Sequence, residues 1–180
     1  GLAHVLPDNL YTDKQSMEEV IKNVLAKAMK FTELGGVTLR LDMPTQEQIP
    51  NRTLEAGKTM RISVIDTGIG IAQEKQKLVF EAFQQADGTT SSKYGGPGLG
   101  LTISRELSRL LGGDLSMSSD GAGLGCTFSL YLPVGSADQV HQEDNGDEPN
   151  VPTVASFAKC IAACGEVTAQ LGCVVRANTV

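Results

Sequence analysis

Three glycine clusters between regularly patterned segments constrain the fold of this chain more than any other feature. They are Asp66-Thr67-Gly68-Ile69-Gly70, Gly95-Gly96-Pro97-Gly98-Leu99-Gly100 and Gly121-Ala122-Gly123-Leu124-Gly125. Glycine adopts positive φ without strain and lets backbone N–H groups come close to a neighbour or a ligand. Each cluster therefore predicts either a tight turn or a ligand-holding loop, and no single cluster decides between the two.

The segments around these clusters alternate between helical and strand patterns. Apolar residues recur at three- and four-residue steps from Asp13 to Thr32, which predicts a helix with one apolar stripe. We further predict strands at Val37–Leu41 and Met60–Asp66, helices at Gln73–Phe83 and Leu99–Leu111, and closing strands at Leu115–Ser118 and Cys126–Leu132. The polar stretch from Pro44 to Lys58 is expected to be a long exposed hairpin connection. This order fits an α/β fold in which a sheet carries helices on one face, a two-layer sandwich.

Charge and composition exclude some functions. The formal net charge of −6 and the absence of a basic cluster argue against nucleic acid as a partner. No run approaches the roughly 18 apolar residues that cross a bilayer, so we expect no direct membrane contact. The spacing of the four cysteines matches no zinc pattern, and we expect reduced thiols and a cytoplasmic location. We see no secretory leader. Because the chain starts at Gly1 without an initiator methionine, we expect a piece of a longer protein, and a membrane-anchored parent stays open.

The composition changes after Pro133. We assign residues 1–134 to one domain and residues 135–152, which are acidic and contain no lysine or arginine, to a solvated linker. Residues 153–180 are rich in alanine, valine and cysteine, with a predicted helix at Ala155–Leu171. They are too few to form a core alone, so they either dock on the main domain or begin a following domain. A receiver-type domain would need paired acids that Val151–Phe157 lacks.

Two sets of polar side chains are candidates for ligand contacts. Asp66 ends an apolar strand, where its carboxylate either accepts a hydrogen bond from an exocyclic amine or starts a turn. Glu19, Asn23, Lys27 and Lys30 project from one face of the first helix, either into solvent or toward phosphates. The glycines before the Leu99 helix would offer backbone donors to a phosphate. A dinucleotide-binding interpretation of that cluster fails because the cluster does not follow a strand.

In this order, the segments resemble the catalytic and ATP-binding domain of histidine kinases. That domain shares a superfamily with type II topoisomerases, ninety-kilodalton heat-shock chaperones and mismatch-repair ATPases. The resemblance covers roughly Leu6 to Val134 and is carried by five sequence boxes: an N box at Asn23–Thr32, glycine boxes at Asp66–Ile71, Gly96–Leu101 and Gly123–Phe128, and an F box at Phe80–Phe83. Five boxes in the family's order are far more specific than any one of them.

The resemblance implies a Bergerat-type ATP-binding fold, a mixed sheet backed by three helices, with ATP or ADP in a cleft. Asp66 would bind the adenine amino group, Lys30 would reach the phosphates, and a lid from about Gln84 to Tyr94 would be anchored by Phe80 and Phe83. Asn23 and Lys30 would be the catalytic residues. The implied nucleotide site comprises Asn23, Lys27, Lys30, Phe31, Asp66, Gly68, Gly70, Ile71, Lys93, Gly96, Gly98, Leu99, Gly100, Leu101 and Thr127.

The chain departs from the family at the N box. The family places asparagine at both ends of an Asn-x-x-x-Asn core, and the second asparagine helps to hold Mg²⁺. Lys27 stands at that second position. An ammonium group has no lone pair, whereas Mg²⁺ requires oxygen ligands. Asn23 is then the remaining candidate metal ligand, and we expect impaired Mg²⁺ binding, with Lys27 neutralising phosphate charge where the metal would lie.

Further departures also fall in the phosphate half of the implied site. Pro97 replaces a threonine and supplies no N–H. Ser92 and Ser16 replace arginines that are frequent in relatives. The adenine half is intact, so nucleotide binding, including that of ADP, is predicted to survive where phosphoryl transfer is weakened.

Two functions remain open at this point. One is the ATP-binding catalytic domain of a possibly hybrid sensor histidine kinase. That domain would transfer the γ-phosphoryl group to a histidine on a separate helical dimerisation domain, upstream of a response regulator receiver domain. The other is a degenerate nucleotide-binding or interaction module. His4 and His141 lack the acceptor's pattern, so we expect no autophosphorylation within this chain. A topoisomerase-type ATPase would need an acidic base where Asn23 stands.

Overall fold

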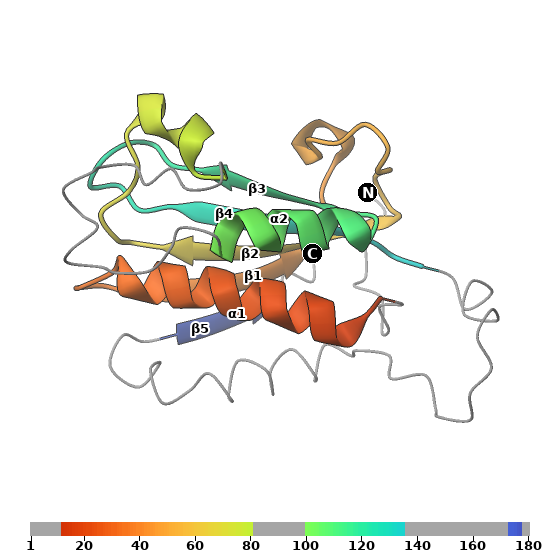
Figure 1. The fold of residues 1–180 in the computed structure, drawn as a ribbon, viewed down its shortest axis with the longest axis horizontal. Coiled ribbons are helices and arrows are strands. Elements are labelled where there is room, and N and C mark those ends of the chain that lie inside the picture. The colour runs from red at the N-terminus through yellow and green to blue at the C-terminus, as the bar shows by residue number, and fades with distance from the viewer. Residues whose placement is uncertain (1–11, 81–99, 136–172, 178–180) are drawn as a thin grey trace.

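A single mixed sheet forms the body of the protein. The computed structural model describes residues 12–80, 100–135 and 173–177. The strands are β1 (Val37–Asp42), β2 (Thr59–Asp66), β3 (Asp114–Ser118), β4 (Thr127–Pro133) and β5 (Cys173–Ala177), and their order in the sheet is β3-β4-β2-β1-β5. The pairs formed by β1 with β2, β2 with β4 and β3 with β4 are antiparallel, whereas β5 lies parallel to β1 (Figure 1). The predicted mixed sheet is therefore confirmed.

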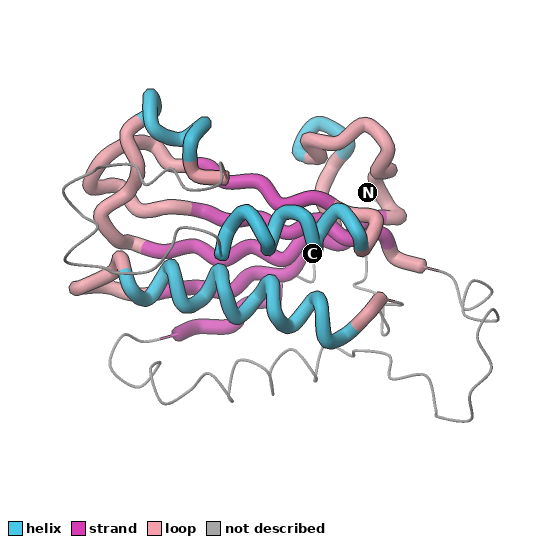
Figure 2. The backbone as a smooth tube through the Cα atoms, in the orientation of Figure 1, coloured by secondary structure: helices cyan, strands magenta, loops and turns pink. Residues whose placement is uncertain are grey.

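Two α-helices, α1 and α2, lie side by side across one face of the sheet (Figure 2). Helix α1 (Lys14–Lys30) begins where Asp13 caps it, with the Asp13 carboxylate accepting a hydrogen bond from the Ser16 backbone N–H at 3.2 Å. The predicted stripe is buried against the sheet: Met17, Val20, Ile21, Val24, Leu25 and Ala28. The helix ends at Phe31. Lys27 and Lys30 in its last turn interact favourably with the negative end of the helix dipole.

Helix α2 (Gly100–Leu110) packs Leu101 and Leu107 against the main core, as an apolar stripe would, but it leaves two other apolar side chains in solvent. Ile103 and Leu110 are 46% and 84% exposed. The fully buried residues are Ser104 and Ser108, whose small side chains let α2 pack closely against α1. The hydroxyl of Ser108 is satisfied by the carbonyl of Ser104, at 2.7 Å, so burial leaves no unpaired donor there.

The third predicted helix is shorter and tighter than expected. Residues Gln73–Leu78 form the 3₁₀ helix η2, and the remainder of the predicted Gln73–Phe83 helix, from residue 81, lies outside the described residues. A 3₁₀ segment of this kind is a connector whose hydrogen bonds are poorer than those of an α-helix. Of the three helices expected beside the sheet, two are α-helices in the described residues and the third is this 3₁₀ segment.

The connection between β1 and β2 is less exposed than its polar composition suggested. It holds the short 3₁₀ helix η1 (Gln46–Gln48). Ile49 and Leu54 are buried against Tyr131 of β4, and the Tyr131 hydroxyl donates to the Gln48 carbonyl at 2.9 Å. The two apolar residues in this stretch therefore form a small second core that fixes the connection on the sheet.

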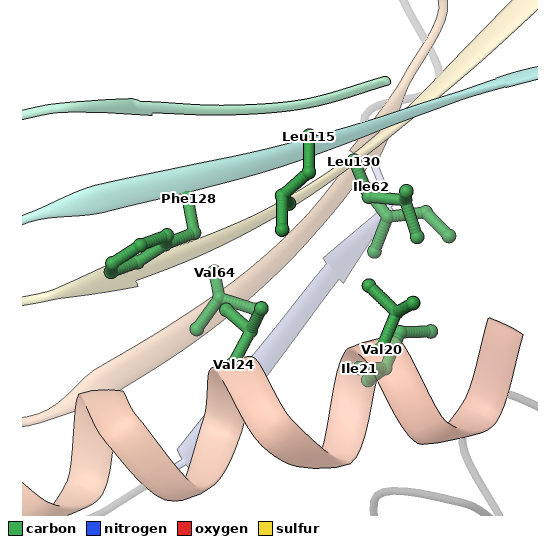
Figure 3. A pocket seen from close by; sticks show the side chains of 8 residues that line it. All are labelled: Val20, Ile21, Val24, Ile62, Val64, Leu115, Phe128 and Leu130. Carbon is green, nitrogen blue, oxygen red and sulfur yellow. The ribbon is translucent and has the colours of Figure 1, made fainter. Parts of the chain in front are cut away.

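The main core lies between α1 and the sheet. It contains one cavity of about 10 Å³, lined entirely by apolar side chains of α1, β2, β3 and β4 (Figure 3). A space of this size holds at most one water molecule, and it offers that water no polar partner. The cavity is therefore a packing void and not a ligand site.

The C-terminal segment contributes a strand to the sheet edge. Strand β5 pairs with β1 from Val37 opposite Cys173 to Leu41 opposite Ala177. Residues 173–177 thus lie against the main domain, and whether residues 153–180 as a whole dock there or begin a following domain stays a prediction. The predicted helix at Ala155–Leu171 and residues 136–152 of the linker lie outside the described residues. Within the described ranges, none of the helices combines the length and hydropathy that a bilayer crossing requires.

Candidate functional site

Asp66 ends β2 at the edge of the helical layer and is 6% exposed. Its Oδ1 atom accepts hydrogen bonds from the backbone N–H groups of Gly68, at 2.9 Å, and Cys126, at 3.2 Å. No described residue donates a hydrogen bond to its Oδ2 atom. Burial raises the pKa of the Asp66 carboxyl, against the two hydrogen bonds, which lower it. One oxygen is thus fixed by the backbone and the other is left to accept a further donor.

The first and third glycine clusters hold each other in place. Gly123 donates its N–H to the Ile69 carbonyl at 2.6 Å, and Gly125 donates to the Gly68 carbonyl at 3.1 Å. A Cβ atom on Gly70, whose φ is +64°, would lie 2.1 Å from the Gly121 carbonyl oxygen. The third cluster is therefore a structural support for the loop that follows Asp66. Its sequence pattern alone had favoured a turn while leaving a ligand loop open.

Ser119 and Gln76 fix the end of the same loop. The Ser119 hydroxyl accepts a hydrogen bond from the Ile71 N–H at 3.0 Å and donates to the Gly125 carbonyl at 2.6 Å. The Gln76 amide donates to the carbonyls of Ile71 and Ser119. The sequence analysis missed both residues, because a serine and a glutamine near turns carry no pattern of their own. The half-buried Ile71 is consequently held beside the Asp66 loop.

Phe31 connects the end of α1 to the Asp66 loop. Its carbonyl accepts the Ile69 N–H at 3.1 Å, and a Cβ on Gly68 would lie 2.2 Å from that carbonyl oxygen. Only glycine fits at position 68 for this reason. The structure thus brings together five residues of the predicted nucleotide site, which we call the base-side residues: Phe31, Asp66, Gly68, Gly70 and Ile71.

Two lysines lie over the Phe31 ring. The Lys27 and Lys30 ammonium nitrogens are 6.0 and 5.9 Å from the ring centroid, within the range of a cation–π contact. Burial, followed by the neighbouring charge of Lys30, lowers the pKa of the Lys27 ammonium. This face of α1 is therefore positively charged next to the Asp66 loop.

Asn23 lies one turn before Lys27 and connects α1 to α2. Its side-chain amide donates to the Ser104 hydroxyl at 3.2 Å. Ser104 is completely buried, a placement that no apolar periodicity signals. Leu101, also predicted for the site, lies in the first turn of α2, where it packs against the main core. The predicted Gly100 begins α2, and space around it is open.

The described part of the F box is anchored on α2. The Phe80 carbonyl accepts a hydrogen bond from the Thr102 hydroxyl at 3.0 Å. The Arg105 guanidinium stacks on the Phe80 ring at 4.8 Å from the centroid. Phe83, the lid and the predicted phosphate-side residues lie outside the described residues: Lys93, Gly96, Gly98 and Leu99, together with Ser92 and Pro97.

The strand register places Thr127 away from the Asp66 carboxylate. Thr127 lies opposite Ile65, and alternation along β4 puts its side chain on the face opposite to that of Phe128, which belongs to the main core. The backbone N–H of Cys126 contacts Asp66 instead. Cys126 is a free, half-buried cysteine, and burial raises the pKa of its thiol to about 11, so it is a neutral neighbour.

The donor set beside Asn23 does not fit a Mg²⁺ ion. Residues 12–80, 100–135 and 173–177 contain no group of three or more histidine, cysteine, aspartate or glutamate side chains that could hold a metal. Lys27 supplies only donors, and the Asn23 amide nitrogen is directed at Ser104. Of these two side chains only the Asn23 carbonyl oxygen can ligate a cation, and the Lys27 ammonium, which has no lone pair, repels a cation placed beside it.

The sequence resembles known kinases over most of its length. The profile of the family described as "Histidine kinase-, DNA gyrase B-, and HSP90-like ATPase" matches residues 12–136. The chain is 35% identical over 127 residues to "Hybrid signal transduction histidine kinase F" of Dictyostelium discoideum, covering 71% of this chain and 11% of that protein. It is 34% identical over 127 residues to "Signal transduction histidine-protein kinase BarA" of Escherichia coli K12, covering 71% and 13%. The chain therefore spans a small part of each relative.

Two solved structures share the fold. The mycobacterial sensor histidine kinase MprB has a TM-score of 0.51 and 28% identity, covering 67% of this chain and 72% of that chain. The crystal structure of full-length ShkA in complex with AMPPNP has a TM-score of 0.53 and 27% identity, covering 93% of this chain and 32% of that chain. The profile match spans every element described above except β5.

Proposed function

Because the chain belongs to the histidine kinase-, DNA gyrase B- and HSP90-like ATPase family, as a histidine kinase ATP-binding domain, we propose that Asp66 and the loops bonded to it bind the adenine ring of ATP. In the parent protein, the bound ATP donates its γ-phosphoryl group to a histidine on a separate helical dimerisation domain. A response regulator receiver domain then accepts the phosphoryl group. The name of the Dictyostelium relative, a hybrid histidine kinase, supports a parent of this type.

The arrangement of the Asp66 carboxylate carries this proposal. Its Oδ1 atom is held by two backbone N–H groups, and its Oδ2 atom has no donor among the described residues. The Asp66 side chain is largely buried, but its Oδ2 atom is not among the buried atoms that lack a partner, so this oxygen stays accessible to an N–H donor of a ligand. The adenine amino group is such a donor. The half-buried Phe31 and Ile71 beside it offer apolar surface to the ring.

Cationic groups at the other end of the site suit the phosphates. Lys27 and Lys30 extend from the last turn of α1, and α2 begins at Gly100 with its N-terminal N–H groups. A helix N-terminus and lysine side chains both attract phosphate oxygens. We assign Lys30 to phosphate contact and Asn23 to the catalytic end of the site. A cytoplasmic location, where ATP and reduced thiols occur together, agrees with these roles and with the free Cys126.

The adenine assignment is tested by exchanging donor for acceptor on the nucleotide base and acceptor for donor at residue 66. Inosine diphosphate carries a carbonyl where ADP carries the amino group. The wild-type chain should bind ADP about tenfold or more tightly than inosine diphosphate in calorimetry. Asp66→Asn, which places a donor there, should reverse this preference.

Asp120→Asn is the matched control, because Asp120 is an exposed aspartate in the neighbouring turn. This variant should retain the wild-type preference for ADP. Equal binding of the two nucleotides by the wild-type chain would refute the adenine assignment.

A second candidate function is a nucleotide-binding module without phosphotransfer. The observation that favours it is the donor set at Asn23 and Lys27, which does not fit Mg²⁺. Lys27→Asn combined with Pro97→Thr should restore transfer to a supplied helical acceptor domain if the rest of the site is competent. Transfer by the wild-type chain at a rate equal to that of the double variant would exclude the module.

A further inference from the structure

Lys27 is an ammonium group to which no carboxylate of residues 12–80 or 100–135 is paired. Its nitrogen lies 6.0 Å from the centroid of the Phe31 ring. Other lysines of α1 do have such partners, since Lys14 and Lys22 both pair with Glu18 at 3.9 Å. Burial, followed by the neighbouring charge of Lys30, lowers the pKa of the Lys27 ammonium, so a nearby negative charge would stabilise its protonated form. The site therefore favours an anionic ligand.

The position of Lys27 relative to the Asp66 loop limits what that anion can be. Phe31 lies one turn after Lys27, and its carbonyl is bonded to the Ile69 N–H within the loop. Phe31 thus connects the lysines of α1 to the loop of Asp66, the carboxylate proposed to bind the adenine amino group. An anion joined to an aromatic base, as in an adenine nucleotide, spans these two features.

We propose that this site binds an adenine nucleotide without a divalent cation, with the Lys27 ammonium neutralising the phosphate charge that a metal ion neutralises in relatives. This inference rests on the proposed adenine site. Its physical basis is the chemistry of the two side chains. The Lys27 ammonium has three N–H groups and no lone pair, so it can bind an anion and cannot ligate a cation. The Asn23 amide nitrogen donates to Ser104, which leaves only the Asn23 carbonyl oxygen for a ligand. A divalent cation at that place would also be repelled by the ammonium charge.

Calorimetry with ADP, in excess Mg²⁺ and in excess chelator, tests the inference on the full chain. The wild-type affinity should be the same within about twofold under both conditions. Lys27→Asn should lose about tenfold in affinity in chelator, since a charge-assisted hydrogen bond is removed, and should recover most of that loss when Mg²⁺ is added. Melting curves of both proteins establish that the variant is folded.

Lys22→Asn is the matched control, because it removes the same charge from an exposed position on the same helix. It should retain the wild-type affinity in both conditions. Enhancement of wild-type binding by Mg²⁺ of tenfold or more would overturn the metal-free site while leaving the adenine site in place. Failure of ADP to bind the wild-type chain under either condition would overturn the adenine site itself, and the two failures are therefore distinguishable.

Discussion

The two halves of the candidate site are built in different ways. In the adenine half, the Asp66 loop is fixed by backbone hydrogen bonds to Phe31 and to the third glycine cluster. In the phosphate half, long lysine side chains project from α1, and their contacts are with the Phe31 ring. Substitution of a glycine in the first half disturbs the fold, whereas substitution of a side chain in the second changes charge and leaves the backbone intact. This difference explains how Lys27 can replace asparagine without loss of the fold.

The largest effect is expected at Gly125, on which the adenine half depends. A Cβ at this position would lie 2.0 Å from the Asp66 carbonyl oxygen, and its φ is +71°. Gly125→Ala should reduce the free energy of unfolding by more than about 3 kcal/mol and abolish measurable ADP binding. Urea denaturation and calorimetry measure the two effects.

Gly123 provides the control for this substitution. Its φ is +83°, but an added Cβ would meet no atom within 4 Å. Gly123→Ala should therefore cost only the strain of a left-handed backbone, about 1–2 kcal/mol, and preserve ADP binding. Equal losses from the two variants would mean that the contact with Asp66 is not what holds the loop.

A smaller effect is expected from Asp66, because ionisation of its buried carboxyl lowers the free energy of unfolding. Burial raises the pKa of this carboxyl, so the folded protein binds the proton more tightly than the unfolded chain does. Stability therefore falls as the pH rises from the unfolded pKa of about 3.9 through the folded value. At neutral pH, Asp66→Asn should raise the melting temperature by a few degrees while it reverses the preference for ADP over inosine diphosphate.

The pH dependence of the stability gained by Asp66→Asn distinguishes removal of the carboxylate charge from other effects of the substitution. The difference between the two proteins should shrink as the pH falls through the folded pKa of Asp66. Asp13 provides the opposite sign, because its hydrogen bonds with Ser16 lower its pKa, and its contribution is lost as the pH falls. A stability gain of Asp66→Asn that stays constant down to pH 3 would contradict the role assigned to the buried charge.

Sequence patterns identified the elements that depend on local periodicity. The apolar stripe of α1 and the strand that ends at Asp66 are both where their spacing predicted. The five base-side residues came from the resemblance, and the structure places them together. Local periodicity suffices for the stripe and the strand, because each follows from the spacing within one element, whereas the site residues needed the family's boxes.

Interactions between distant segments were not predictable in this way. The contacts of Gly123 and Gly125 with the Asp66 loop join segments more than fifty residues apart, and no periodicity in either one indicates the other. The burial of Ser104 and Ser108 was missed because a search for apolar spacing assigns serine to the surface. Strand β5 pairs with the edge of the sheet from outside the resemblance. These features depend on register and packing, which are properties of pairs of elements.

The smallest expected effect tests whether the phosphate half is also tied to the fold. Asn23 and Ser104 are joined by one 3.2 Å hydrogen bond between α1 and α2. A double-mutant cycle of Asn23→Ala and Ser104→Ala should give a coupling of about 0.5–1 kcal/mol in the free energy of unfolding. Ser108→Ala, equally buried one turn later, should show no coupling with Asn23→Ala.

Ser104→Ala should leave ADP affinity within about twofold, because a phosphate half held by side chains requires Asn23 itself and not its partner on α2. If Ser104→Ala weakened ADP binding as much as Asn23→Ala did, the interhelical bond would be part of the binding site. The phosphate half would then be as firmly built into the backbone as the adenine half, and the contrast between them would fail.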